Sequence, residues 1–249
     1  MSPPIGFPQT HSTNRTRIKI CGLTREQDVD AAVQAGADAL GFVLFKDSPR
    51  YVSLERAAVL ARRLPPFVTP VLLFVNETPE TIAAACDLIP SATLQFHGDE
   101  SAAICHQSAR QGRHPYLRAA RIPLGDAGAG FDLVKYAQDY SQATAILLDA
   151  HVEGFGGGGK AFNWSLLPTN VSSHLVLGGG LNAANVSDGI AIVRPRCLSL
   201  AVDVSSGVEA QAPDGSVLKG IKDAAKIQAF VAAVRVADKQ FESIATPGA

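Results

Sequence analysis

Hydrophobic and polar positions along the chain follow two alternating spacings. Short runs of β-branched and aliphatic residues, typical of strands buried on both faces, alternate with longer Ala- and Leu-rich segments of helical spacing. Eight runs of the first kind occur: Arg17–Ile20, Ala39–Leu44, Val68–Val75, Ala92–Phe96, Pro115–Ala119, Thr144–Leu148, His174–Leu177 and Leu198–Val202. The pattern therefore predicts eight short strands separated by helices.

The helical segments carry their own boundary signals. The expected helices are Arg25–Ala35, Leu54–Arg63, Pro79–Leu88, Glu100–Gln111 and a long last one over Lys219–Ala237. Thr78 followed by Pro79 predicts an N-cap with proline at the first helical position. The fifth unit is the weakest, because Pro123–Gly130 is too rich in Gly and Pro for a regular helix.

Strands that alternate with helices pair in parallel through right-handed crossovers. Eight such units suit a closed barrel, whereas the alternative, an open doubly wound sheet, usually carries G-x-G-x-x-G after its first strand. Here the first strand ends in Cys21-Gly-Leu-Thr24. We expect an α/β protein, a single-domain (β/α)8 TIM barrel over residues 17–249, preceded by a disordered N-terminal extension over residues 1–16.

Composition narrows the class of partner. With 22 basic and 23 acidic residues the net charge is -1, so there is no overall field to attract nucleic acid or an anionic membrane. No apolar run approaches the roughly 20 residues that span a bilayer. The cysteines form no C-x-x-C pair and no metal-ligating cluster, which favours a reducing, cytoplasmic setting and no metal. Monomer and homodimer both stay open.

Two loops at the end of the chain are rich in donors for an anion. In this fold the residues just past the carboxyl ends of the strands line the active site, and loops seven and eight commonly hold phosphate. Gly178-Gly179-Gly180 follows the seventh run, and Ser205-Ser206-Gly207 lies just beyond the eighth. Backbone N–H groups and hydroxyls there predict a phosphate site, although glycine-rich loops also serve simply as tight turns.

The segment Gly154–Lys160 has the spacing of a nucleotide-binding P-loop. Ala161, however, stands where that motif needs Ser or Thr to ligate magnesium, and a sixth barrel loop is the wrong place for it. We interpret the segment either as an active-site loop that closes over the substrate or as an exposed loop without a role.

Cys21 ends the first strand. A lone cysteine there is often a small core residue, but strand alternation puts Lys19 and Cys21 on the face opposite Ile18 and Ile20. If the aliphatic pair meets the helices, Lys19 and Cys21 point into the barrel, where a cation would favour the thiolate. Barrel closure sets strand eight beside strand one, so Asp203 is the expected partner of Lys19.

Three other polar residues follow strands. Asp149 ends an apolar run, where partial burial would favour a proton-donating carboxyl group, although a turn cap is the alternative. His97 follows the fourth run, and we interpret it as a hydrogen-bonding wall of the site. Arg50 lies in the second loop, and its guanidinium is shaped to bind a carboxylate with two hydrogen bonds.

Several of these segments match one family as a set. They are Ile18–Thr24, Gly36–Phe42, Ser48–Tyr51, Leu94–Gly98, Leu147–Asp149, Gly178–Leu181 and Ala201–Glu209. Together they resemble the phosphoribosylanthranilate isomerases over nearly the whole chain, from about Arg17 to Val236. The Lys-Ile-Cys-Gly start and the Asp-Val-Ser-Ser-Gly-Val-Glu end are specific in this order.

The resemblance implies an Amadori rearrangement in tryptophan biosynthesis, acting on a small phosphosugar without metal or cofactor. Cys21 would be the general base and Asp149 the general acid. The expected substrate-binding residues are Arg50, His97, Gly179, Gly180, Asp203, Ser205, Ser206 and Gly207. A related histidine-pathway isomerase has Asp at the end of strand one, which Cys21 argues against. A catalytically inactive phosphosugar-binding barrel is the alternative from another class.

Overall fold

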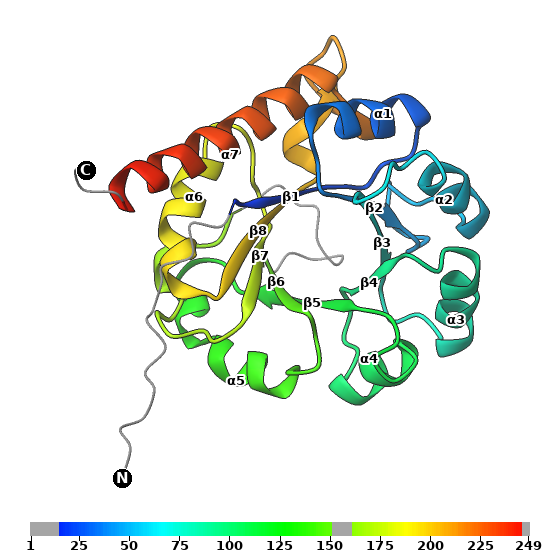
Figure 1. Cartoon of the computed structure of the whole chain (residues 1–249), viewed down its shortest axis with the longest axis horizontal. Coiled ribbons are helices and arrows are strands. Elements are labelled where there is room, and N and C mark those ends of the chain that lie inside the picture. Colours follow the sequence, from blue (N-terminus) through cyan, green and yellow to red (C-terminus); the bar gives the residue numbers. More distant parts are fainter. Residues whose placement is uncertain (1–14, 151–160, 246–249) are drawn as a thin grey trace.

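The predicted barrel is confirmed. The computed structural model describes residues 15–150 and 161–245, and eight parallel strands close into a barrel in chain order (Figure 1). The strands are β1 Arg17–Cys21, β2 Ala39–Val43, β3 Thr69–Phe74, β4 Thr93–Phe96, β5 Tyr116–Ile122, β6 Ala145–Ala150, β7 His174–Leu177 and β8 Ser199–Val204. Each overlaps an expected run, because a strand covered on both faces needs a continuous apolar sequence.

Helices surround the barrel (Figure 1). They are α1 Glu26–Ala35, α2 Leu54–Ala61, α3 Pro79–Leu88, α4 Ala102–Ser108, α5 Leu133–Asp139, α6 Val186–Val193 and α7 Ala224–Ala245, with 3-10 turns η1 Gly125–Gly130, η2 Trp164–Leu166, η3 Arg194–Arg196 and η4 Ser206–Val208. The Thr78 hydroxyl accepts from the backbone N–H of Thr81 and Pro79 opens α3, as predicted. α4 is shorter than expected at both ends, and neither α5 nor α6 is among the expected helical segments.

Strand alternation sorts the apolar side chains into two environments. Ile18 and Ile20 belong to the large core between the strands and the helices. Cys21 instead lies inside the barrel, in a small cluster with Val43, Leu73 and Val75. The expected orientation of β1 is therefore confirmed, and a reactive group reaches the barrel interior because its neighbours in sequence serve the outer core.

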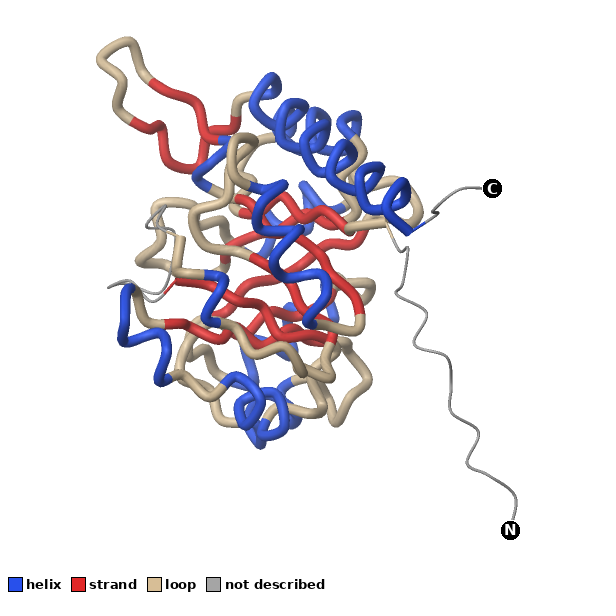
Figure 2. The backbone as a smooth tube through the Cα atoms, turned by 90° about the vertical axis from the view of Figure 1, so that its left-hand side faces the viewer, coloured by secondary structure: helices blue, strands red, loops and turns tan. Residues whose placement is uncertain are grey.

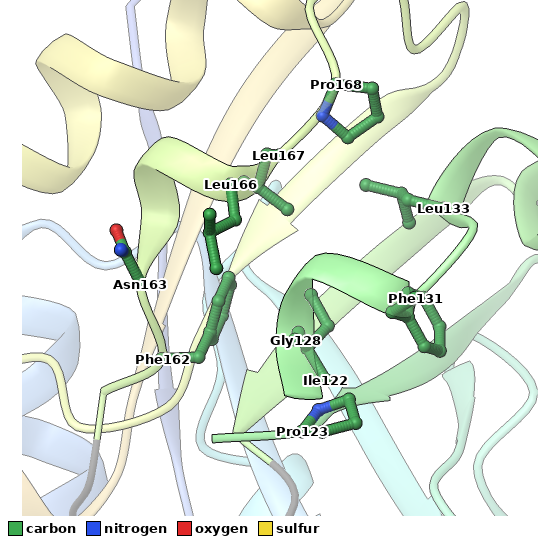
Figure 3. A pocket seen from close by; sticks show the side chains of 10 residues that line it. All are labelled: Ile122, Pro123, Gly128, Phe131, Leu133, Phe162, Asn163, Leu166, Leu167 and Pro168. Atoms are coloured by element: carbon green, nitrogen blue, oxygen red, sulfur yellow. The ribbon is translucent and has the colours of Figure 1, made fainter. Parts of the chain in front are cut away.

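The sixth unit has a 3-10 turn where a helix would follow β6. Apolar side chains from Phe162 to Pro168 face η1 and the start of α5 and leave a small pocket between the two segments (Figure 3). Phe162 and Leu167 are buried there. This packing covers the outside of the barrel where a longer helix would otherwise lie.

The expected last helix over Lys219–Ala237 is wrong in its first part. Residues Val217–Lys222 form β10, which pairs antiparallel with β9 (Glu209–Gln211) in a hairpin that projects from the barrel (Figure 2). Gly220 has a φ of 82°, which a helix does not contain. The carboxylate of Asp223 accepts from the backbone N–H groups of Ala225 and Lys226, so it caps α7 at its true start.

The start of the described chain lies against the barrel. Thr16 is buried, and its hydroxyl and backbone N–H bond the carboxylate of Asp238 in α7. Residues 1–14 of the expected extension and the Gly154–Lys160 segment lie outside the described residues. Within the described part of the chain, no helix combines the length and hydropathy that a bilayer crossing requires.

Candidate functional site

The candidate site lies at the end of the barrel where all eight parallel strands finish. Cys21 is the last residue of β1, while Asp149 and Asp203 each precede the last residue of their strands, β6 and β8. His97 follows β4 directly. Because the strands are parallel, these four side chains meet at one end.

Lys19 and Asp203 form the predicted ion pair. Their Nζ and Oδ1 atoms are 2.9 Å apart, and the side chains are 5% and 11% exposed. Burial alone would lower the pKa of Lys19. The charges of Asp203 and Cys21, and the hydrogen bonds of both residues with Lys19, outweigh this effect and raise the pKa above its ordinary value. Lys19 is therefore a permanent cation inside the barrel.

Cys21 lies beside this pair. Burial raises the pKa of its thiol above the ordinary value, although the charge of Lys19 opposes the rise. A Cβ atom built on Gly41 of β2 would lie 2.7 Å from the Cys21 sulfur and 3.1 Å from Lys19 Nζ. Glycine at this position therefore leaves the room in which thiol and ammonium approach each other.

Asp149 is held by His97. The His97 Nε2 and Asp149 Oδ2 atoms are 3.0 Å apart, with side chains 6% and 11% exposed, and Asp149 Oδ1 accepts from the backbone N–H of Ala150. The other ring nitrogen of His97 lies 3.0 Å from the buried side-chain amide of Gln95. His97, expected as a wall of the site, thus contacts the expected acid directly.

Arg50 is buried in a cluster of charges. Its Nε and Nη2 atoms donate to the two carboxylate oxygens of Glu209 at 2.7 and 2.9 Å. Lys222 Nζ lies 3.3 Å from Glu209 Oε1 and donates to the backbone carbonyl of Ser205 at 2.9 Å. The fork of Arg50 is therefore occupied on one edge, and Nη1 keeps no partner among the described residues.

The two donor-rich loops are in contact, as a shared phosphate site requires. A Cβ on Gly207 would overlap the carbonyl oxygen of Leu181 in the loop after β7, so only glycine lets the loops approach this closely. Gly179 has a φ of 73°, and a Cβ there would lie 2.8 Å from Asp149 Oδ1. Gly180 follows it, and Ser205 and Ser206 open the turn after β8.

Two residues of this region were missed from the sequence. Gln95 is fully buried inside the barrel, and its only signal is a polar residue in the apolar run of β4. Lys222, also buried, lay in the segment that we expected to be helical, where a lysine suggests exposure. The contact of Gln95 with His97 is local, between residues two positions apart, whereas the contacts of Lys222 with Ser205 and Glu209 depend on the β9–β10 hairpin.

Comparisons with known proteins agree on one family. The family model described as N-(5'phosphoribosyl)anthranilate (PRA) isomerase matches residues 18–233. The N-(5'-phosphoribosyl)anthranilate isomerase of Methylibium petroleiphilum is 60% identical over 224 residues, covering 90% of this chain and 96% of that protein.

Solved structures give the same answer. The phosphoribosyl anthranilate isomerase of Thermotoga maritima aligns with a TM-score of 0.75 and 38% identity, over 89% of this chain and 99% of the other. A further structure, a phosphoribosyl anthranilate isomerase in complex with reduced 1-(o-carboxyphenylamino)-1-deoxyribulose 5-phosphate, has a TM-score of 0.68 and 34% identity over the same shares.

Proposed function

The chain belongs to the family of N-(5'-phosphoribosyl)anthranilate isomerases, and from this premise we propose that Cys21 and Asp149 carry its reaction as base and acid. The reaction, a step of tryptophan biosynthesis, converts N-(5-phosphoribosyl)anthranilate to 1-(2-carboxyphenylamino)-1-deoxyribulose 5-phosphate. It is an internal redox exchange, in which C1 of the sugar is reduced as C2 is oxidised. The chain itself then needs only to move protons and to hold the two ends of the substrate.

Asp149 gives the first proton. Protonation of the ribose ring oxygen breaks the bond from this oxygen to C1, and the nitrogen lone pair forms a Schiff base. Asp149 Oδ2 shares a hydrogen bond with His97 Nε2, and Asp149 Oδ1 accepts from the backbone N–H of Ala150, which supports a fixed orientation of the acid. A positioned acid of this kind typically contributes ~10²–10⁴-fold to the rate.

Cys21 takes the second proton. Its thiolate removes the proton from C2, the electron pair moves toward the nitrogen, and an enolamine forms. C1 then gains a proton while the C2 hydroxyl loses one, which yields the ketone. The ammonium of Lys19 beside the sulfur supports the thiolate, and the raised pKa of Cys21 makes this thiolate a strong base once it has formed.

The anionic ends of the substrate have separate clamps. Arg50 binds the anthranilate carboxylate, and the loops that contain Gly179, Gly180, Ser205, Ser206 and Gly207 bind the phosphate. Asp203 contributes through Lys19. Anchoring both ends holds the sugar between acid and base, which supplies the positioning part of catalysis.

The single observation that carries this assignment is the barrel end shared by two buried pairs, Lys19–Asp203 beside Cys21 and His97–Asp149. The test follows the loss of substrate fluorescence with wild type, Cys21→Ser and Asp149→Asn. We expect kcat to fall by ~10²–10⁴-fold in each variant. Full activity in either one rules out its assigned role, and a wild type without turnover would favour the inactive phosphosugar-binding barrel.

The cellular setting stays a proposal. Four free thiols and a biosynthetic family support a cytoplasmic enzyme, without nucleic-acid or membrane partners. A monomer or a homodimer is expected, which light scattering on the purified protein distinguishes.

A further inference from the structure

One buried cluster of charges lies close enough to Cys21 for the charge of Lys222 to act on its thiol, but its described hydrogen bonds involve neither Cys21 nor Asp149. Its members are Arg50, Glu209 and Lys222, and the side chains of Glu209 and Lys222 are fully buried. Two cations surround one carboxylate, so the cluster keeps one formal positive charge. Buried charges are expensive to desolvate, and a cluster that keeps a net charge calls for a reason beyond stability.

Glu209 is the centre of this cluster. Its Oε1 accepts from Arg50 Nε at 2.7 Å and from the backbone N–H of Gly220 at 2.8 Å, with Lys222 Nζ at 3.3 Å. Its Oε2 accepts from Arg50 Nη2 at 2.9 Å. Burial would raise the pKa of Glu209, but the Arg50 hydrogen bonds and the charge of Lys222 lower it below the ordinary value, so the carboxylate stays ionised.

Lys222 extends the cluster to the loop after β8. Its ammonium donates to the Ser205 carbonyl at 2.9 Å and lies 3.3 Å from the Ser205 hydroxyl. Together with Glu209, these contacts give a partner to each of its three N–H groups. A Cβ on Gly22 would lie 2.5 Å from Arg50 Cδ and 3.1 Å from the Ser205 hydroxyl, so the arginine stem and the serine are neighbours.

We propose that Glu209 and Lys222 are positioning residues: Glu209 aims the Arg50 guanidinium, Lys222 fixes Ser205, and their shared contact sets the spacing between the carboxylate clamp and the phosphate clamp. This inference rests on the proposed function, which gives the substrate an anion at each end. Neither residue is assigned a contact with the substrate. A preorganised pair of clamps reduces the ordering cost of binding, because fewer long side chains have to be fixed when the substrate arrives.

Glu209→Gln is the decisive variant, because a positioning role predicts weaker anion binding and a role through charge alone predicts stronger anion binding. The amide keeps an oxygen for Gly220 and Lys222 but turns an NH₂ group toward Arg50 Nη2, which breaks one prong of the fork. Removing a negative charge by itself strengthens anion binding. If Glu209 acts by position, the variant instead binds anthranilate about tenfold more weakly than wild type. Unchanged or tighter binding overturns the proposal.

Lys222→Met tests the phosphate clamp. We expect it to bind inorganic phosphate about tenfold more weakly, with a smaller loss for anthranilate, because Ser205 loses its anchor while Arg50 keeps both bonds to Glu209. Equal losses for the two probes would indicate a general charge effect and overturn the selective role. Glu209→Asp, which keeps the charge but withdraws it by one methylene, replaces Glu209→Gln if the amide variant does not fold.

Asp30→Asn is the matched control. Arg63 donates to Asp30 through the same Nε and Nη2 atoms, at 2.9 and 2.6 Å, but on the exposed surface. We expect the Asp30→Asn variant to have the inhibition constants, kcat and KM of the wild type. Inhibition constants for phosphate and anthranilate, kcat and KM are measured for all proteins.

For Glu209→Gln the KM rises about tenfold while kcat changes little, since no reacting atom is touched. A wild type that neither turns over substrate nor binds the probes rejects the proposed function. A wild type that does both, beside a Glu209→Gln variant with unaltered KM, rejects only this inference.

Discussion

The two buried carboxylates at the mouth of the barrel have nearly the same surroundings but different partners. Asp203 lies 2.9 Å from Lys19, and Asp149 lies 3.0 Å from His97; each carboxylate is 11% exposed. The partner of Asp203 is a permanent cation, so protonating Asp203 would leave a buried ammonium without its counter-charge. An imidazole can be neutral, so Asp149 is able to carry a proton without that penalty.

This difference favours Asp149 over Asp203 as the acid of the proposed function. Distance and burial do not separate the two residues, but the chemistry of the partner does. The Lys19–Asp203 pair also lies beside Cys21, where it sets the local charge, whereas Asp149 lies beside Gly179 of the loop that is proposed to bind the phosphate. In the proposed function, the first pair therefore shifts the pKa of the base, and the second pair orients the acid.

The largest expected effect comes from making the same exchange at both carboxylates. Asp149→Asn removes the transferable proton and lowers kcat by ~10²–10⁴-fold, whereas Asp203→Asn keeps the acid and lowers kcat far less. Steady-state kinetics by substrate fluorescence measures both. Equal losses of kcat would show that the partner does not distinguish the two carboxylates.

A smaller effect is expected on stability, where breaking the Lys19–Asp203 pair should cost more than breaking the His97–Asp149 pair. Lys19→Met leaves Asp203 buried without a cation and lowers the free energy of unfolding by ~3–5 kcal/mol. His97→Asn removes a hydrogen bond from Asp149 and lowers it by ~1–3 kcal/mol. Urea unfolding gives both values. A His97 variant that is less stable than the Lys19 variant contradicts the expectation that loss of the cation beside Asp203 costs more than loss of the hydrogen bond with Asp149.

The sequence predicted one of these pairs and not the other. Lys19 and Asp203 follow from period-two alternation and from barrel closure, because both rules fix which faces and which strands meet. The contact between His97 and Asp149 joins β4 to β6, and no local pattern encodes it. Arg50 and Glu209 are 159 positions apart, and their contact also depends on the β9–β10 hairpin.

The elements show the same division. The bounds of β7 and α3 are as predicted, because hydrophobic runs and the cap at Thr78 are local signals. The β9–β10 hairpin was not predicted, although Gly220 and the cap at Asp223 mark it. An Ala-rich helix follows the hairpin, and its helical spacing dominates the hydrophobic pattern of this stretch of sequence. Charge clusters that need several loops at once were the least predictable part of the site.

The smallest and most specific effect is the pH dependence of Cys21, the proposed base. Burial raises the pKa of Cys21, Lys19 lowers it and Asp203 raises it. Because the thiolate is the reactive form, kcat/KM of the wild type should rise with pH through a midpoint above the ~8.5 of a free thiol. Lys19→Met should move this midpoint to higher pH, and Asp203→Asn should move it to lower pH.

The rate of Cys21 alkylation by iodoacetamide, with Cys21→Ser as background, gives an independent measure of this midpoint. Shifts in the same direction for both variants would mean that the pair acts on the base through structure and not through charge.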